Sequence, residues 1–307
     1  RYDLLYRICI GAAGRISVEK EELYLVKKSQ TDAQNGTVIF KAFTNNSGSG
    51  DITVEYNNGK RGKNPECKAI RSMSVLSQMQ SRLPSDIEKY AQTIKTIQYV
   101  QTTLSNMFVL EPIPSLMRGY SRIGDSVLRR NCSNISAVLA SIQENSPDDW
   151  QKFCDIIESL PENEIQGISF VKTTINDVIL IQKEQNGKST ENIDATRLSD
   201  GTLRCIAVLA AVISEPEHSL IAIEELDNGI HPSRIIKLIK SLCEIAQRRK
   251  IDLVLTTHNV TVLNGLSKED VLGVSVVYRD KETQASRIVP FVEIENQAGI
   301  LASGGIG

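Results

Sequence analysis

The stretch Leu220-Ile221-Ala222-Ile223-Glu224-Glu225 decides the fold, because a short apolar run ending in two carboxylates is typical of a buried strand whose carboxyl end meets a ligand. Apolar residues at three-to-four spacing predict a helix from Pro232 to about Arg249. A second apolar run follows at 253–255 and ends at Thr256-Thr257-His258-Asn259. Strand, helix and strand at this spacing predict a parallel unit in which both carboxyl ends lie at one edge of a sheet.

The side chains at that edge suit nucleotide hydrolysis. Glu224 can hold Mg²⁺, which prefers hard oxygen ligands, and Glu225 can polarise the attacking water. His258 can donate a hydrogen bond to the γ-phosphate as charge develops there. Taken singly, an exposed strand end or a hydrogen-bonded framework histidine would explain these residues. Their combination favours a nucleotide site.

A further motif, Leu198-Ser199-Asp200-Gly201-Thr202, opens a helix over 202–213 that is apolar almost all round and is expected in a core. The free N–H groups and the dipole at the start of a helix favour an anion such as a triphosphate. Gly201 permits close approach of another backbone. Ser199 or Asp200 could instead cap the helix, and capping alone is the alternative interpretation.

In this order, the motifs resemble those of ABC-type ATPases. The matching parts are the signature motif at Leu198–Thr202, the Walker B strand at Leu220–Glu225, the D-loop at Asp227-Asn228 and the switch histidine at His258. Within that superfamily the chain is most similar to the soluble AAA branch related to OLD, SMC and RecF-type heads. Glu224–Pro232 and the tail Glu295–Gly299 resemble bacterial proteins that act in defence against phage, often beside a nuclease, such as the Septu and retron ATPases.

The resemblance implies an α/β fold of the ABC-ATPase (P-loop NTPase) type, with a mixed sheet, flanking helices, an N-terminal antiparallel strand region and a helical insertion. It implies ATP and Mg²⁺ as cofactors and a homodimer or higher homo-oligomer. Ser199, Asp200 and Gly201 of one head would then meet the nucleotide held by the other. Asp227 and Asn228 would also bind the nucleotide, and Asp227 would link the two sites. Hydrolysis would control a partner effector, for which a nuclease is the expectation.

Two features depart from the family pattern. The usual Walker B aspartate is Glu224, which is one methylene longer. No Gly-x-x-x-x-Gly-Lys-Ser/Thr motif occurs, so the sequence contains no loop that would cradle phosphates. The segment Gly11–Arg15 contains glycines but lacks the lysine and the following helix. We expect the P-loop upstream of Arg1, and its loss is the alternative.

The composition is that of a globular protein, with 41% hydrophobic and 23% charged residues. A net charge of −2 gives no general attraction to nucleic acid or membranes, so any contact with nucleic acid would need a local patch. No apolar run reaches transmembrane length. The six cysteines are scattered, which predicts reduced thiols in a cytoplasmic protein and argues against a metal site built from them.

The chain is expected to contain three parts: a strand-rich part of the ATPase core at 1–70, a helical insertion at 71–164 and a C-terminal ATPase lobe at 165–307. The predicted strands of the first part are Tyr2–Ile10, Glu22–Val26, Thr37–Phe43 and Asp51–Tyr56. Helices are predicted over 87–104, ending before Pro112 and Pro114, and as a pair over Ile135–Leu160. The third part should contain a hairpin of Ile168–Val171 and Val178–Ile181.

Beyond His258 we expect a short helix, Val260–Leu266, and two strands, Val271–Tyr278 and Arg287–Ile294, that extend the sheet as an antiparallel edge. Two basic segments complete the prediction. Residues 57–68 are expected to form a solvated loop. The arginines between Arg118 and Asn134 could reach nucleotide, DNA, a partner or solvent, and the sequence does not decide between these.

Two other functional classes remain open. A DNA-repair or chromosome-organising head should carry a long coiled coil, yet no adequate heptad run appears between Asn57 and Thr196. A non-hydrolysing scaffold is favoured by Glu224 and the missing P-loop, but it would leave Glu225 and His258 unexplained. A transporter subunit is disfavoured, because neither the insertion nor the continuation after Asp227 resembles that branch.

Overall fold

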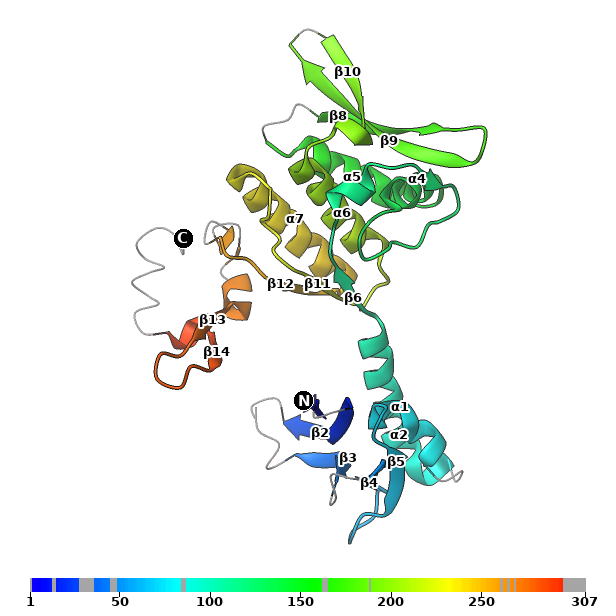
Figure 1. Cartoon of the computed structure of the whole chain (residues 1–307), viewed down its shortest axis with the longest axis vertical. Helices are drawn as coiled ribbons and strands as arrows, with labels where there is room; N and C mark the ends of the chain where they lie inside the picture. Colours follow the sequence, from blue (N-terminus) through cyan, green and yellow to red (C-terminus); the bar gives the residue numbers. More distant parts are fainter. Residues whose placement is uncertain are drawn as a thin grey trace. The chain divides into compact units, whose positions relative to one another are not determined.

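A computed structural model describes residues 2–12, 15–27, 36–44, 49–83, 87–161, 165–187, 189–259, 262–263, 266–267 and 269–294. The chain forms two compact units, Arg1–Ser105 and Asn106–Gly307, and each has its own hydrophobic core (Figure 1). The boundary falls inside the segment expected as a helical insertion, and the division into three parts stays a prediction. Most of the helix expected at Val260–Leu266, and the tail motif Glu295–Gly299, lie outside the described residues.

The first unit is a five-stranded antiparallel sheet with two helices. Its strands follow chain order: β1 (Tyr2–Gly11), β2 (Ser17–Lys27), β3 (Thr37–Phe43), β4 (Asp51–Tyr56) and β5 (Glu66–Ile70). Its helices are α1 (Val75–Arg82) and α2 (Ile87–Ser105). The four predicted strands are confirmed. The loop predicted over 57–68 is wrong at its end, because Glu66–Lys68 pair with β4 as part of β5.

A buried carboxylate ties the first of these helices to the sheet. Glu21 of β2 accepts hydrogen bonds from the N–H groups of Val75 and Leu76, at 2.6 and 2.7 Å, where α1 begins. The hydroxyl groups of Tyr6 and Ser74 donate to the same carboxylate, each at 2.9 Å. Because the start of a helix favours negative charge, Glu21 can be buried there without a cationic partner.

The second unit is built on a parallel sheet in the order β12-β11-β6, with bounds Asp252–Leu255, Leu220–Ile223 and Met107–Leu110. Helix α7 (Pro232–Arg249) connects β11 to β12, which confirms the predicted strand–helix–strand unit. Ile223 pairs with Leu255 on one side and with Leu110 on the other. All three strands therefore end at the same edge, where the candidate site lies.

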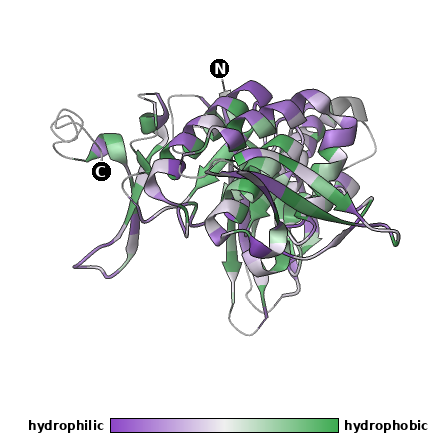
Figure 2. Ribbon diagram, turned by 90° about the horizontal axis from the view of Figure 1, so that it is seen from above, coloured by the Kyte–Doolittle hydropathy of each residue, from purple (hydrophilic) through white to green (hydrophobic). Residues whose placement is uncertain are grey.

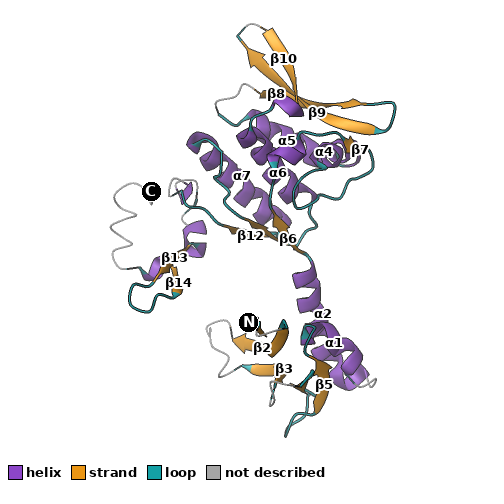
Figure 3. Cartoon of the chain, viewed as in Figure 1, coloured by secondary structure: helices purple, strands orange, loops and turns teal. Residues whose placement is uncertain are grey.

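Helices separate this parallel sheet from an antiparallel one in the same unit (Figures 1 and 3). Helices α6 (Asp200–Ser214) and α7 contact the parallel strands, while α4 (Ile135–Asn145) and α5 (Pro147–Glu158) contact both α6 and the antiparallel sheet. That sheet consists of β8 (Ile165–Lys172), β9 (Asp177–Asn186), β10 (Ser189–Asp194) and the short β7 (Ser121–Arg122).

Burial follows the apolar pattern of the helices. Helix α6 lies in the core with nearly every side chain from Gly201 to Ile213 buried, as predicted. Hydrophobic and hydrophilic residues are interspersed along the helical ribbons in Figure 2. Helix α7 is amphipathic, because its buried apolar residues recur at three-to-four spacing: Ile235, Leu238, Ile239, Leu242 and Ile245. Within the described part of the chain, none of the helices has the length and hydrophobicity that crossing a membrane requires. The α/β fold class predicted from the sequence is confirmed.

The prediction for the last segment is wrong in part. β13 (Ser275–Arg279) and β14 (Ser286–Pro290) pair with each other in a separate two-stranded sheet, instead of extending the parallel sheet. Residues 271–273 and Phe291–Glu293, expected as strand, form single 3-10 turns, and the first of these turns begins at Asp270. Ala195–Arg197 is a further 3-10 turn, and Pro114 begins the short helix α3 (Pro114–Met117) where a helical region was expected to have ended.

Candidate functional site

Two backbone N–H groups of the loop after β11 donate hydrogen bonds to Thr256, the residue that follows β12. The N–H of Glu225 donates to Thr256 Oγ1, and the N–H of Leu226 donates to the Thr256 carbonyl, each at 3.0 Å. Leu226 anchors the loop because its side chain is buried in the core. Glu224 and Glu225 thus leave the strand as exposed side chains at a fixed place on the edge of the sheet.

The backbone of Glu225 is held in an unusual conformation. Its φ is 46°, in the left-handed region that residues other than glycine rarely adopt. The Glu225 carbonyl accepts a hydrogen bond from the N–H of Asn228 at 2.9 Å, and the Asn228 amide donates to the Glu225 carboxylate at 3.3 Å. Five other described residues that are not glycine also have a positive φ, so the conformation shows that the chain turns sharply after β11 and does not by itself mark a functional site.

Asp227 and His258 come from the two neighbouring strand ends. The Thr257 hydroxyl donates a hydrogen bond to the Asp227 carboxylate, and it accepts one from the N–H of Asn259 at 3.0 Å. These bonds fix the turn that carries His258, whose imidazole is exposed. No hydrogen-bond partner for that imidazole is found among the described residues, so it is available to a ligand. The predicted convergence of Glu224, Glu225 and His258 at one edge agrees with this arrangement.

The start of α6 shows which residue of the signature motif caps the helix. Ser199 is the N-cap, and its Oγ accepts a hydrogen bond from the N–H of Thr202 at 3.1 Å. The Ser199 hydroxyl also lies 2.9 Å from Thr202 Oγ1, which in turn accepts from Arg234 at 3.2 Å. Asp200 instead points outward and pairs with Arg118 at 2.6 Å. The capping interpretation therefore holds for Ser199, without excluding a ligand at the same helix end.

Gly201 is buried against the loop after β11. A Cβ atom at this position would lie 2.3 Å from the carbonyl oxygen of Gly229 and 3.3 Å from its carbonyl carbon. The close approach expected at Gly201 is thus made to Gly229 of the same chain. The start of α6 and the loop after β11 are therefore in close contact at these two glycines.

The side chains at this edge fit one end of a Mg²⁺-nucleotide. Glu224 and Glu225 are exposed carboxylates, and among the described residues no three His, Cys, Asp or Glu side chains cluster as a metal cage would. Mg²⁺ needs no such cage, because it commonly takes one or two carboxylates and completes its shell with phosphate oxygens and water. Glu224 is the residue that would hold it, and Glu225 and His258 are exposed at the same edge of the sheet.

Sequence reasoning missed three contributors. Thr256 and Thr257 were noted only as part of a motif, although their hydroxyl groups hold Glu225 and Asp227. The sequence leaves open whether Arg118 reaches nucleotide, DNA, a partner or solvent, and in the structure it bonds to Asp200 across 82 positions of the chain. The position of Thr256 and Thr257 directly after the apolar run of β12 is a sequence signal that could have identified them. Nothing local in the sequence connects Arg118 to Asp200.

The sequence of this chain matches one protein family. Residues 95–264, more than half of the chain, match the model described as "AAA domain, putative AbiEii toxin, Type IV TA system". The match includes the parallel sheet, α6, α7 and all the candidate site residues. The chain belongs to this family. No match is found among the curated proteins.

Solved structures similar to this chain include heads of SMC proteins. One is an SmcHead bound to the C-winged helix domain of ScpA, with 9% identity, a TM-score of 0.41, and coverage of 83% of this chain and 76% of that chain. The SMC head domain from Thermotoga maritima has 11% identity and a TM-score of 0.37, and the match covers 89% of this chain and 74% of that one. A Pyrococcus furiosus Smc head domain bound to the C-terminal domain of ScpA has 9% identity and a TM-score of 0.38, and the match covers 88% of this chain and 81% of that one.

Proposed function

We propose, on the premise that the chain is a member of this AAA-domain family, that it binds and hydrolyses ATP at the edge formed by the ends of β11 and β12. The observation that carries the proposal is the loop after β11. Two exposed carboxylates follow the strand, and hydrogen bonds to Thr256 hold the second in a left-handed backbone conformation. The neighbouring strand β12 adds His258, whose side chain is exposed at the same edge of the sheet.

Each side chain has a distinct role in the proposal. Mg²⁺, when bound, would neutralise charge on the phosphate oxygens, and Glu224 would be its protein ligand. Glu225 orients the attacking water and draws its proton toward the carboxylate. His258 donates a hydrogen bond to the γ-phosphate as negative charge grows on it. Asn228 keeps Glu225 in place through its amide.

We further propose that two copies of the chain form the complete site. The exposed Ser199 and Asp200, with Gly201 behind them, would face the nucleotide held by a second copy. Asp227 and Asn228 lie in the loop that Gly201 touches at Gly229. A movement of that loop on hydrolysis would therefore shift the start of α6, which couples the two sites of a dimer.

At the level of the cell, the proposed role is control of a partner effector, a nuclease, in defence against phage. The family description names a putative toxin, which supports a role in defence against phage. The resemblance of Glu224–Pro232 to defence ATPases supports it as well. Direct action on nucleic acid is the alternative.

ATP turnover by the full-length protein tests the proposal, with the Glu225→Gln variant as the comparison. We expect wild type to hydrolyse ATP, and Glu225→Gln to lose roughly 10²-fold or more of the rate because the amide cannot take a proton. The variant should accumulate as an ATP-bound dimer in mass measurements. Glu217→Gln, which alters an exposed glutamate outside the site, is the matched control and should behave as wild type.

Two results would count against the proposal. If full-length wild type neither turns over ATP nor changes mass with ATP, the roles given to Glu224, Glu225 and His258 fail, and a non-hydrolysing scaffold takes their place. If Glu225→Gln hydrolyses ATP as fast as wild type does, Glu225 is not the residue that polarises the water.

A further inference from the structure

The first residue of α6 is an acid in a place where the proposed function needs an anion to bind. Asp200 begins the helix, and its side chain is 64% exposed. A carboxylate there stabilises the helix, because the N-terminus carries a partial positive charge. The same carboxylate would repel the phosphates of a nucleotide brought to this helix end. Under the proposed function, a cation that offsets the charge of Asp200 would favour the approach of a nucleotide to this helix end.

Arg118 supplies that charge. It follows α3, which contacts α6, and its side chain is 29% exposed. Its Nη2 donates to the Asp200 carboxylate at 2.6 Å and to the Leu198 carbonyl at 2.8 Å. One nitrogen thus bonds to the residues on both sides of Ser199. Arg118 fixes the backbone of the signature motif and neutralises its acid at the same time.

The neighbouring arginines do not share this geometry. Arg122 is 80% exposed and approaches Asp177 only at 3.8 Å. Arg129 is 59% exposed and pairs with Asp125, four residues away in its own loop, at 2.7 Å. Within the described part of the chain, neither bonds to residues 198–202. Lower exposure and two hydrogen bonds to residues 198–202 therefore distinguish Arg118 from Arg122 and Arg129.

We propose that Arg118 is a positioning residue of the site shared by two protomers: it neutralises Asp200, so that the start of α6 can receive the γ-phosphate of a nucleotide held by a second copy. The inference rests on the proposed function, because it requires that two copies meet around ATP. It assigns a role to a residue outside all the recognised motifs.

The test measures ATP-dependent dimer formation and ATP turnover of the full-length protein. Arg118→Ala should raise the protein concentration needed for the ATP-bound dimer by roughly tenfold or more, since a charge-assisted hydrogen bond is lost and a bare carboxylate remains. Adding Asp200→Asn to Arg118→Ala should recover much of the loss, because it removes the repulsion. Raising the salt concentration should also weaken the Arg118→Ala defect by screening the same repulsion.

Three controls separate charge from structure. Arg118→Lys keeps the charge and should keep most of the dimer, whereas Arg118→Gln, with a long neutral side chain, should resemble Arg118→Ala. Arg122→Ala removes an exposed arginine of the same segment and should match wild type. Trp150 fluorescence during unfolding shows whether each variant is folded. If Arg118→Ala is not, the comparison of Arg118→Lys with Arg118→Gln decides.

The outcomes are distinct. The neutralising role would be overturned by two results together. The double variant would form the ATP-bound dimer no better than Arg118→Ala does, and salt would not change the dimer defect of Arg118→Ala. Wild-type dimer formation and turnover by Arg118→Ala would overturn the inference while leaving the proposed function standing. A wild type that neither dimerises nor hydrolyses ATP would overturn both.

Discussion

Gly201 shows how a single hydrogen atom in place of a side chain sets the geometry of the site. In most helices, replacing glycine by alanine stabilises the fold, because glycine loses more conformational freedom on folding. Here an added methyl group would lie 2.3 Å from the Gly229 carbonyl oxygen, which is backbone and cannot move aside cheaply. We therefore expect Gly201→Ala to destabilise the second unit by roughly 1–3 kcal/mol, as overpacking does.

Urea unfolding followed by Trp150 fluorescence measures this effect, because Trp150 lies in the second unit and is the single tryptophan of this sequence. Gly119→Ala is the matched control. Its added Cβ would have as its nearest neighbour the Leu116 carbonyl oxygen at 3.9 Å, so we expect a change within about 0.5 kcal/mol. Equal stability of Gly201→Ala and wild type would show that the start of α6 does not pack against Gly229 as described.

At this scale the sequence predicts side chains that belong to ordered motifs and misses those that support them. Glu224, Glu225 and His258 were predicted from their places after apolar runs, and the structure puts them at one sheet edge. Arg118 could not be predicted, because its partner lies 82 positions away and no local pattern links the two. Whether Ser199 or Asp200 caps α6 was also undecidable, since both residue types cap helices well.

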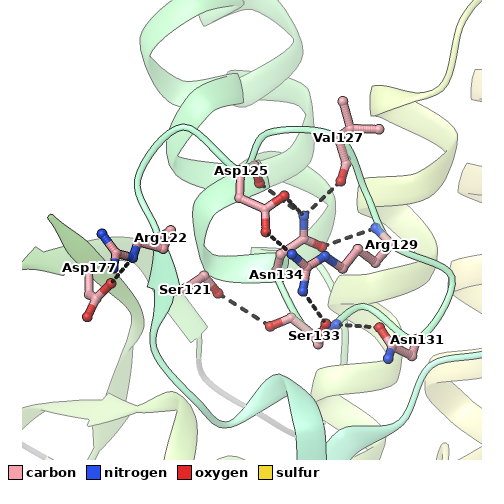
Figure 4. Close-up of polar contacts among 9 residues, drawn as sticks. All are labelled: Ser121, Arg122, Asp125, Val127, Arg129, Asn131, Ser133, Asn134 and Asp177. Atoms are coloured by element: carbon pink, nitrogen blue, oxygen red, sulfur yellow. Dashed lines mark hydrogen bonds and ion pairs between the residues drawn. The ribbon is translucent and has the colours of Figure 1, made fainter.

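At the scale of elements, Asn134 organises the loop between β7 and α4 (Figure 4). Its side chain is buried, and its Nδ2 donates to the carbonyl groups of Asp125 and Val127 at 3.0 and 2.7 Å. Its Oδ1 accepts from the N–H of Arg129 at 3.1 Å. One amide therefore satisfies backbone groups at three points of a loop that has no regular hydrogen-bond ladder of its own.

We expect Asn134→Ala to lower the free energy of unfolding of the second unit by roughly 2–3 kcal/mol, because several partly buried backbone groups lose their partner together. Trp150 fluorescence in urea again gives the measurement. Asn131→Ala is the control, since the Asn131 side chain makes one local bond, to the N–H of Ser133 at 3.1 Å, and should cost about 1 kcal/mol at most. Similar losses for both variants would contradict the organising role of Asn134.

The elements that could be predicted are those with a strong internal pattern. Helix α7 and strand β11 agree with their predicted bounds, because one has a complete apolar stripe and the other an uninterrupted apolar run. Strands β5, β6 and β7 were missed, since pairing with a neighbour defines such short strands more than their own residues do. The prediction that β13 and β14 join the parallel sheet was wrong. Alternation of apolar and polar residues indicates that a strand exists, but it does not show which strand it pairs with.

At the scale of the whole molecule, both units place cysteines in different surroundings. Cys9 in β1 is exposed, whereas Cys132, Cys154 and Cys205 of the second unit are buried. Burial raises the pKa of the Cys132 and Cys205 thiols to about 12, and that of Cys154 to about 11. The thiolate is the reactive form, so these three thiols should be inert in the folded protein near neutral pH. The free thiols agree with the reduced cysteines predicted from the sequence.

The raised pKa values predict how stability depends on alkaline pH. Between the ordinary thiol pKa of 9.0 and about 12, the folded second unit holds protons that the unfolded chain has lost. Because the folded state then binds more protons, its free energy of unfolding should fall as the pH rises through this window. Urea unfolding at pH 8 to 10.5, followed by Trp150, should show the fall. A Cys132→Ala/Cys154→Ala/Cys205→Ala variant should show a smaller slope whatever its absolute stability.

Alkylation at pH 8 tests the same burial without a change of pH. In the folded protein we expect Cys9 to be modified first and the three buried thiols last, at the rate at which the second unit opens. Peptide mapping identifies the order, and Cys9→Ser should remove the fast phase. Fast modification of Cys205 in folded protein would mean that α6 is not in the core. The arrangement that brings the signature motif against Gly229 would then fail with it, because both depend on α6 lying where its apolar sequence predicts.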